Sequence, residues 1–435
     1  MKTSISIFWF RRDLRLHDNH GLYEALKTNT AVLPVFIFDT AILDALPKND
    51  ARVEFIHQQL TGINTRLQAH GSGVSLYHGT PEDIFDQLTN QYDVNAVYCN
   101  HDYEPYAIAR DQKIAELLTS KSIAFKTFKD HVIFEQNEIT KDDGLPYKVY
   151  TPFSKKWLAA FDGGHCDSFA SEESLENTCK LVDYSWVNLI DMEFEPNPIK
   201  IAPYNVNSDI IENYEATRNF PAINGTSKLG PHLRFGTVSV REIVFKAIQH
   251  ENNTFLKELI WREFFMQILW HFPHTVTQSF KPQYDAIKWR NNSEEYKQWC
   301  AGNTGYPLVD AGMRELNQTG FMHNRVRMLV GSFLCKHLLI DWRWGEAYFA
   351  EKLHDFELSS NVSNWQWVAG CGVDAAPYFR IFNPTTQVTN FDKQHTYIKK
   401  WVPDYQELTY PTPMVDHKFA RERCLTTYKE ALGKT

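Results

Sequence analysis

Apolar runs alternate with amphipathic stretches in the first third of the chain, a pattern that predicts strands separated by helices. The predicted strands are residues 5–10 and 31–39, with weaker candidates at 95–99 and around Phe125. Helical periodicity fills the intervening stretches, most clearly at residues 52–70 and 106–118. This order favours βαβ units and a mostly parallel, doubly wound sheet. No G-x-G-x-x-G motif follows the first strand, so a dinucleotide fingerprint is absent.

The pattern changes twice further along the chain. From about residue 130 to 205 the periodicity weakens and glycines, prolines and acidic runs accumulate, which is typical of a long connecting segment. Beyond residue 206 the strand signal disappears and helical patterns continue to about residue 387. The sequence therefore predicts an α/β domain over residues 1–129, a linker over 130–205 and an all-α domain over 206–435.

Two of the predicted helices carry polar and aromatic residues at positions i, i+3, i+4 and i+7. One set is Glu258, Trp261, Arg262 and Phe265, and the other is Asn324, Arg327, Met328 and Gly331. Such spacing places each set on one helix face. A solvated face is the ordinary explanation, but the aromatic neighbours favour two faces that line a cavity.

Residues 361–380 combine large aromatic faces, neutral amides and opposite charges within a single stretch. Trp365 and Trp367 supply the rings, and Asn361 lies one helical turn before them. Small residues between them let a backbone or a flat ligand approach closely. A core helix with incidental tryptophans is an equally good interpretation of this stretch taken alone.

Composition limits the classes of function that need to be considered. The 435 residues are 43% hydrophobic and 14% aromatic, with 12 tryptophans and a formal net charge of -8. Any nucleic-acid binding must therefore depend on a local basic patch rather than on a global field. Seven scattered cysteines without a C-x-x-C pair predict a reducing cytoplasm, with neither a disulfide framework nor a bound metal. No apolar run is long enough to predict a membrane span.

Five blocks of sequence resemble the photolyase/cryptochrome family and occur in that family's order. They are FWFRRDLRLHDN (8–19), GTSKLGPHLRFG (225–236), ELIWREFF (258–265), GNTGYPLVDAGMRELNQTGFMHNRVRM (302–328) and NWQWVAGCGVDAAPYFRIFNPTTQ (364–387). The chain looks most similar to bacterial class I cyclobutane pyrimidine dimer photolyases. This resemblance implies an N-terminal α/β domain, a long linker and a helical domain that holds a folded-back FAD. It also implies a carbon–carbon lyase in which excited, reduced, anionic FAD (FADH−) gives an electron to the dimer in UV-damaged DNA.

The resemblance also assigns residues to the cofactor. Residues matching the family's phosphate contacts are Tyr214, Thr226, Ser227, Lys228 and Leu229. Residues expected around the flavin ring are Arg262, Arg327, Asp355, Glu357 and Asn361. Asn361 would face the flavin N5 atom, and Arg327 would pair with Asp355 and offset the negative charge of the reduced ring. Glu357 stands where the family pattern leads us to expect an aspartate.

A second group matches the site for the lesion and its DNA. Glu258, Trp261, Asn324, Met328 and Trp367 correspond to the dimer pocket, with Glu258, Asn324, Met328 and Asn361 as the catalytic set. Arg262, Arg325 and Arg380 match arginines that hold the DNA backbone, and Arg218 and Lys156 extend that patch. Repair of (6-4) photoproducts is a weaker alternative, because Asn324 follows His323 where those relatives need a second histidine.

Trp365, Trp342 and Trp289 match a tryptophan chain that carries electrons between flavin and surface. Each tryptophan taken alone fits a core residue equally well. For the antenna chromophore the match fails, because the stretch Pro105–Asp111 lacks the Asn-Glu pair expected in folate-binding relatives and an expected cysteine falls near Thr275. A deazaflavin, a flavin or an empty cleft stays open. The alternative functions are a signalling cryptochrome without repair activity and a flavin-dependent redox enzyme. We expect a cytoplasmic monomer that binds no membrane.

Overall fold

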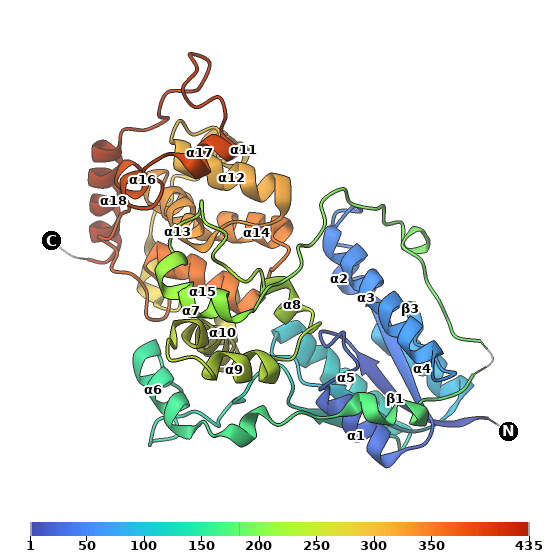
Figure 1. Cartoon of the computed structure of the whole chain (residues 1–435). Helices are drawn as coiled ribbons and strands as arrows, with labels where there is room; N and C mark the ends of the chain where they lie inside the picture. Colours follow the sequence, from blue (N-terminus) through green and yellow to red (C-terminus); the bar gives the residue numbers. More distant parts are fainter. Residues whose placement is uncertain (1, 182, 434–435) are drawn as a thin grey trace. The chain divides into compact units, whose positions relative to one another are not determined.

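The chain forms two compact units in this computed structural model, which describes residues 2–181 and 183–433 (Figure 1). The sheet unit consists of Met1–Glu138, Ala160–Tyr204 and Leu229–Gln249. The helical unit consists of Ile139–Ala159, Asn205–Lys228 and His250–Thr435. Short segments of each unit thus interrupt the other along the sequence. The predicted domain borders near residues 129 and 205 stay predictions.

A five-stranded parallel sheet, counted over the described residues, organises the sheet unit. Its strands are β1 (Ser4–Phe10), β2 (Val32–Asp39), β3 (Ser75–Gly79), β4 (Asp93–Asn100) and β5 (Ala124–Phe128). They lie in the order β3-β2-β1-β4-β5, with every neighbouring pair parallel. The predicted doubly wound parallel sheet is confirmed. The sequence prediction missed only β3 among these strands.

Helices cover both faces of this sheet because side chains alternate along its buried strands. Phe8 and Phe10 of β1 pack in a core shared with α1 (His20–Thr28) and α3 (Ala51–Gln68). Ile7 and Trp9 pack in a second core, shared with α4 (Pro81–Gln91) and α5 (Pro105–Ser120). The remaining elements of this unit are α2 (Thr40–Leu43), η1 (Gly163–Cys166), η2 (Ser171–Asn177), η3 (Ile190–Met192), α8 (Gly230–Arg234) and α9 (Val240–Ile248).

A buried charge network lies beyond the end of β1 in the sheet unit. Arg15 Nη2 lies 2.6 Å from Asp130 Oδ2, and Arg241 Nη2 lies 2.9 Å from Asp130 Oδ1. Arg241 also lies 2.8 Å from Asp18. All four side chains are at most 6% exposed. The two guanidinium groups lower the pKa of Asp130 against the opposing effect of burial.

Helices make up the other unit. They are α6 (Tyr150–Ala160), α7 (Ser208–Thr217), α10 (Thr254–His271), η4 (Pro273–Val276), η5 (Pro282–Ala286), α11 (Ser293–Ala301), α12 (Pro307–Thr319), α13 (Asn324–Ser332), η6 (Phe333–His337), α14 (Trp342–Lys352), α15 (Leu358–Ala369), α16 (Pro384–Phe391), α17 (Thr396–Trp401) and α18 (His417–Ala431). One hydrophobic core joins α11–α15 with α17 and α18. The predicted all-α architecture after residue 206 is confirmed for the helical domain.

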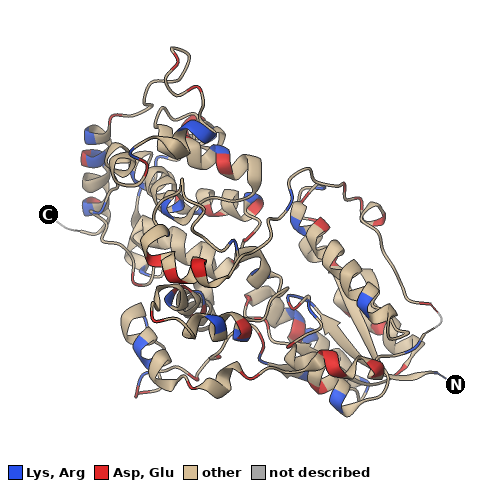
Figure 2. Ribbon diagram, viewed as in Figure 1, with Lys and Arg blue, Asp and Glu red and all other residues tan. Residues whose placement is uncertain are grey.

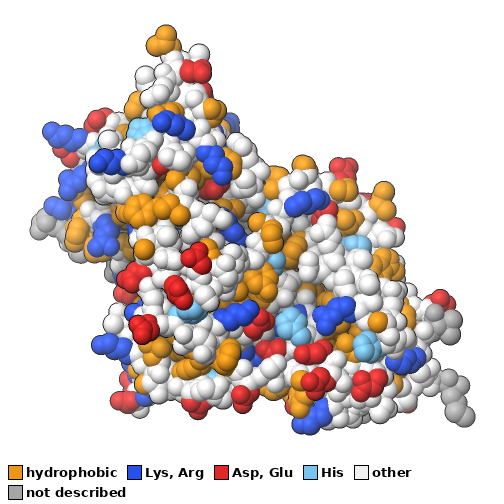
Figure 3. All heavy atoms as spheres, viewed as in Figure 1, with side chains coloured by type: hydrophobic (Ala, Val, Ile, Leu, Met, Phe, Trp, Pro, Cys, Tyr) orange, Lys and Arg blue, Asp and Glu red, His pale blue; other side chains and the backbone are white. Residues whose placement is uncertain are grey.

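Charged side chains of both signs are interspersed along the helices and over the face in view (Figures 2 and 3). This distribution agrees with the modest net charge of -8. Within the described ranges, every helix is too short or too polar to traverse a lipid bilayer. The same residues contain no cluster of three or more His, Cys, Asp or Glu side chains arranged around a metal position.

Candidate functional site

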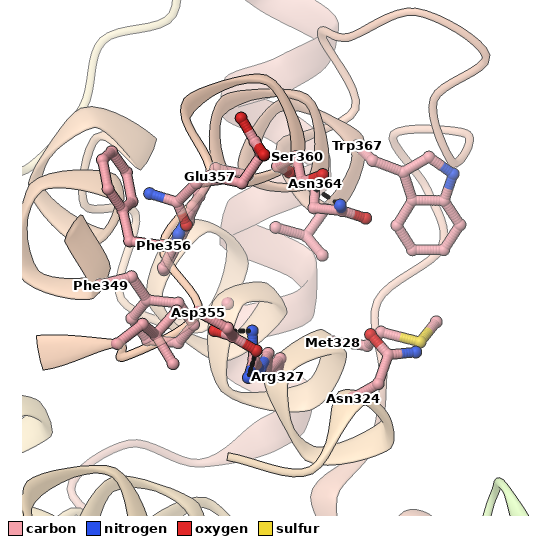
Figure 4. A pocket seen from close by; sticks show the side chains of 15 residues that line it. Asn324, Arg327, Met328, Phe349, Asp355, Phe356, Glu357, Ser360, Asn364 and Trp367 are labelled. Carbon is pink, nitrogen blue, oxygen red and sulfur yellow. Dashed lines mark hydrogen bonds and ion pairs between the residues drawn. The ribbon is translucent and has the colours of Figure 1, made fainter. Parts of the chain in front are cut away.

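A cavity in the helical unit is built from α13, α14, α15 and the segment between α14 and α15. It is lined by Asn324, Arg327, Met328, Gly331, Phe349, Leu353, Asp355, Phe356, Glu357, Ser360, Asn361, Asn364, Trp365, Trp367 and Val368. Its space, including the open mouth, measures about 600 Å³. In Figure 4, Phe349 and Phe356 stand at one side of the cavity, and Asn324, Met328 and Trp367 stand at the other.

The stripe predicted on α13 lines this cavity in full. Asn324, Arg327, Met328 and Gly331 are all among its lining residues, because positions i, i+3, i+4 and i+7 share a helix face. The corresponding stripe on α10, from Glu258 to Phe265, contributes none of the side chains named as lining this space. The α10 stripe thus does not share this cavity.

An ion pair fixes one wall of the cavity. Arg327 places Nη1 3.1 Å from Asp355 Oδ1 and Nη2 2.8 Å from Asp355 Oδ2 (Figure 4). Its Nε donates to the carbonyl of Met322 at 2.7 Å. The guanidinium plane is therefore held at three points, and a bidentate pair of this kind adds geometric specificity. The structure contains the ion pair between Arg327 and Asp355 that the sequence resemblance predicted.

Asn361 has a partly buried acidic partner that sequence reasoning missed. Its amide nitrogen donates to Glu346 Oε1 at 2.8 Å and to the Glu346 carbonyl at 3.1 Å. Burial raises the pKa of Glu346, opposed by this hydrogen bond. Because Asn361 donates from its nitrogen, its carbonyl oxygen is left for another donor. Fifteen residues separate the two in sequence, so no helical spacing signals the contact.

The aromatic and acidic residues of α10 meet different partners. Trp261 stacks on Tyr150, with ring centroids 3.6 Å apart and planes at 6°. One face of the Trp261 indole is therefore covered by an aromatic residue that sequence reasoning did not name. Glu258 forms an ion pair with Arg218. Burial raises the pKa of Glu258, although Arg218 opposes that rise.

Basic side chains gather around the start of α13. Burial lowers the pKa of Lys228 to about 8. Burial, and then the charges of Lys228 and Arg327, lowers the pKa of His323 to about 4. The Nε2 atom of His323 is buried and has no hydrogen-bond partner in the described part of the chain. A partly buried lysine beside a buried imidazole nitrogen without a hydrogen-bond partner suits an anionic ligand.

The other predicted phosphate contacts are less closely grouped. Thr226 and Ser227 are partly buried in the helical unit. Tyr214 lies edge-on to Phe255, with centroids 5.3 Å apart. Leu229 belongs to the sheet unit, where it caps the short helix α8. Their joint action on one phosphate group stays a prediction.

The three chain tryptophans occupy one core at different depths. Trp365 and Trp342 are 3% and 1% exposed, whereas Trp289 is only partly buried. A Cβ atom at Gly345 would lie 2.1 Å from the Trp365 ring, so only glycine leaves room for this indole beside the cavity. Trp365 lines the cavity directly. Trp365 and Trp342 thus lie in the interior, and Trp289 lies nearer the surface.

The predicted DNA contacts differ in how they are paired. Lys156 lies 3.6 Å from Asp142, and Arg262 Nη2 lies 4.0 Å from Glu357 Oε2. Arg325 donates to Asn219 Oδ1 and lies over the ring of Phe391, 4.3 Å from its centroid. Arg380 is exposed on the loop between α15 and α16. Arg380 and Lys156 are thus both exposed, whereas the side chain of Arg262 is only 14% exposed.

Comparisons with known proteins agree with this geometry. Residues 6–174 match the family described as DNA photolyase, and residues 255–409 match the FAD binding domain of DNA photolyase. The deoxyribodipyrimidine photo-lyase of Agrobacterium fabrum is 35% identical, with alignment over 100% of this chain and 99% of that protein.

Two solved structures share the fold over nearly the whole chain. A bacterial class III photolyase from Agrobacterium tumefaciens has a TM-score of 0.89 and 34% identity, covering 100% of this chain and 99% of that one. A Synechocystis sp. PCC6803 cryptochrome has a TM-score of 0.84 and 25% identity, covering 98% and 99%. The sequence resemblance predicted similarity to class I photolyases, whereas this similar solved structure from Agrobacterium tumefaciens is a class III photolyase. The chain belongs to the photolyase/cryptochrome family.

Proposed function

We propose that this protein is a light-driven DNA repair enzyme that splits cyclobutane pyrimidine dimers, a carbon–carbon lyase reaction. The observation that carries this proposal is the cavity in the helical unit. There, the Arg327–Asp355 pair, Asn361 and Trp365 lie beside Asn324, Met328 and Trp367. A cofactor site and a lesion site that share one space suit the direct transfer of an electron.

The residues present fit a bound FAD. Phe349 and Phe356 supply apolar contact for a flat ring, and Arg327 supplies a positive charge beside it. Asn361 offers its carbonyl oxygen, since its nitrogen is held by Glu346. Lys228 and His323 supply positive charge and an open polar atom for phosphate groups. FAD, when bound in its reduced form, supplies the light-driven electron that opens the dimer.

At the lesion side, the protein binds and orients the damaged bases. Trp367 and Met328 offer large apolar contacts, and Asn324 offers an amide that can donate and accept (Figure 4). Base stacking on an aromatic side chain contributes about 1–3 kcal/mol per base. Trp261, backed by Tyr150, does not line this cavity, and we assign it as a second platform for the damaged bases. Because burial raises the pKa of Glu258, a protonated Glu258 can donate a hydrogen bond to a base carbonyl.

Around this opening, we assign Arg218, Arg262, Arg325, Arg380 and Lys156 to the DNA backbone. Base extrusion costs a few kcal/mol and less at a poorly paired site, which favours damaged positions. Trp365, Trp342 and Trp289 are assigned to photoreduction of the cofactor. The second chromophore stays open among a deazaflavin, a flavin and none. A cytoplasmic monomer stays our expectation.

A signalling cryptochrome is the second candidate function, favoured by the TM-score of 0.84 to the Synechocystis protein. The residue at position 361 argues for repair, since signalling relatives often place Asp or Cys there. Asn324 argues against (6-4) photoproducts as the main substrate. A flavin-dependent redox enzyme that never binds DNA would not need the arginines around the opening.

The test of repair uses the purified, photoreduced protein and UV-irradiated oligothymidylate. Illumination with blue light should restore thymine absorbance, whereas the dark control should show no recovery. An oligonucleotide that carries only (6-4) products should show no recovery under the same light. If irradiated oligothymidylate gains no absorbance in the light while the FAD is bound and reduced, the repair proposal is wrong and the cryptochrome candidate gains support.

A further inference from the structure

Lys336 is a buried lysine whose ammonium group donates hydrogen bonds to the backbone of a surface loop. It lies in η6, a π-helical turn that continues directly from α13, and its residue exposure is 0%. Its Nζ donates to the carbonyl of Tyr378 at 2.9 Å and to the carbonyl of Arg380 at 3.2 Å. The same Nζ lies 5.6 Å from the centroid of the Tyr428 ring. π-helical turns inside longer helices are rare and frequently occur at functional sites.

The surroundings of this ammonium do not neutralise it. Lys336 makes no ion pair with any described residue. The thiols of Cys335, Cys371 and Cys424 lie around it. Burial, together with a smaller effect of the Arg380 charge, lowers the pKa of Lys336 to about 8. A buried charge without a counter-ion destabilises a fold, and a methionine of similar shape would avoid that penalty. The lysine therefore calls for an explanation other than stability.

The tethered loop comprises residues 370–383, between the end of α15 and the start of α16. Its outer part is accessible, with Phe379 60% exposed and Arg380 exposed beside it. Nearer α15, Asp374 holds a left-handed conformation with φ of 43° and accepts a hydrogen bond from the Tyr150 backbone at 3.1 Å. The loop is thus fixed on the inside, while the side chains of Phe379 and Arg380 are exposed.

We infer that Lys336 is a positioning residue for DNA binding, because it fixes the backbone at Arg380 so that the guanidinium is presented to a phosphate of the damaged strand. This inference rests on the proposed function. The two carbonyl contacts bracket Phe379, so they fix the orientation of the loop at its exposed point. The cavity wall and the loop anchor also lie on one continuous segment, since α13 carries Asn324 and Arg327 and then runs into η6. A phosphate at Arg380 would add the negative charge that this part of the protein lacks.

A double-mutant cycle separates positioning from general stability. The wild-type protein and the variants Lys336→Met, Arg380→Gln and the double variant would be titrated with UV-irradiated oligothymidylate in the dark, at several salt concentrations. Lys418→Met, on the exposed surface of α18, is the control for the loss of one positive charge. We expect Lys336→Met to bind about five- to tenfold more weakly, with a salt slope smaller by about one phosphate contact. Its thermal midpoint should equal or exceed that of the wild type.

The cycle also gives the decisive outcome. If Lys336 acts through Arg380, the double variant should bind within about twofold of Arg380→Gln alone. Additive losses, or an unchanged salt slope in Lys336→Met, would overturn the inference. If the methionine variant does not fold, Lys336→Gln enters the same cycle, because its amide keeps a donor without the charge. A wild-type protein that shows no preference for irradiated over unirradiated oligothymidylate would instead refute the proposed function.

Discussion

Two buried arginines of the sheet unit and two lysines of the helical unit, Lys228 partly buried and Lys336 fully buried, differ in how their charge is balanced. In the sheet unit, Arg15 and Arg241 both contact Asp130, and Arg241 also contacts Asp18. Each guanidinium therefore has a carboxylate partner inside the fold. In the helical unit, Lys228 and Lys336 make no ion pair with the described residues. Burial lowers the pKa of each of these lysines to about 8.

This difference distinguishes charged groups that stabilise the fold from charged groups that are available to bind an anionic ligand. A paired network such as that of Asp130 is complete without any further partner, and removal of one member leaves uncompensated charge. An unpaired lysine destabilises the protein alone and gains its counter-ion only when an anion binds. Both anions expected of the proposed function, the pyrophosphate of FAD and the phosphates of DNA, would meet the helical unit at such lysines or beside them.

The largest expected effect is on the stability of the sheet unit. The change Asp130→Asn should lower the free energy of unfolding by about 3–5 kcal/mol, because Arg15 and Arg241 are left buried without a counter-charge. Urea denaturation followed by circular dichroism would measure it. Asp143→Asn, at an exposed loop position, is the control and should leave the unfolding midpoint unchanged. Equal midpoints for both variants would show that the buried network is not structural.

A substitution at Lys228 should have the opposite signature. Lys228→Met should weaken FAD binding to the apoprotein about 10- to 100-fold, the range for loss of a hydrogen bond to a charged group. The apoprotein itself should be no less stable, because a partly buried charge without an ion-pair partner among the described residues has been removed. Equilibrium dialysis with FAD would give the affinity, with Lys418→Met as the charge control. An unchanged FAD affinity would remove Lys228 from the phosphate site.

Periodicity made part of the site predictable. Asn324, Arg327, Met328 and Gly331 share one helix face whatever the helix packs against, and all four line the cavity. The stripe that begins at Glu258 does not line this cavity, because periodicity identifies a helix face and not what that face meets. What that face meets depends on tertiary packing.

Contacts between distant segments could not be read from the sequence. Tyr150 stacks on Trp261, although the two residues are 111 positions apart in the sequence. Glu346 on α14 likewise accepts a hydrogen bond from Asn361 on α15. The strand Ser75–Gly79 was missed for a local reason. Its sequence SLYHG holds only two large apolar residues among serine, histidine and glycine, which have low or modest strand propensity. Pairing with β2 supplies what the local sequence lacks.

The titration of Lys336 should appear as a pH dependence of stability. An unfolded lysine titrates near pH 10.5, and the folded group near pH 8. Between these values the unfolded chain binds more protons, so rising pH favours the folded state. The wild type should therefore gain about 1–2 kcal/mol relative to Lys336→Met from pH 8 to 10.

The comparison of the two proteins isolates this lysine from its titrating neighbours. Cys335, Cys371, Cys424 and Tyr428 face the ammonium, and burial raises the pKa of each. These four groups are present in both proteins, as is Arg380. Urea denaturation at each pH would provide the free energies. Parallel pH curves for the wild type and the variant would show that the lysine is neutral, or paired, in the folded state.

The smallest expected effect concerns the Glu258–Arg218 ion pair, which DNA binding would have to separate. Glu258 pairs with Arg218, as carboxylates do in the sheet unit, yet burial raises the pKa of Glu258. If DNA phosphate takes Arg218, Glu258 loses its partner and gains a proton, which it can donate to a base carbonyl. Glu258→Ala should then lower the repair yield per absorbed photon about fivefold, which corresponds to the free energy of about one neutral hydrogen bond. The FAD content should not change. Glu258→Gln, which keeps a donor, should retain more of the yield. Equal yields for the wild type and the alanine variant would place Glu258 with the structural pairs instead.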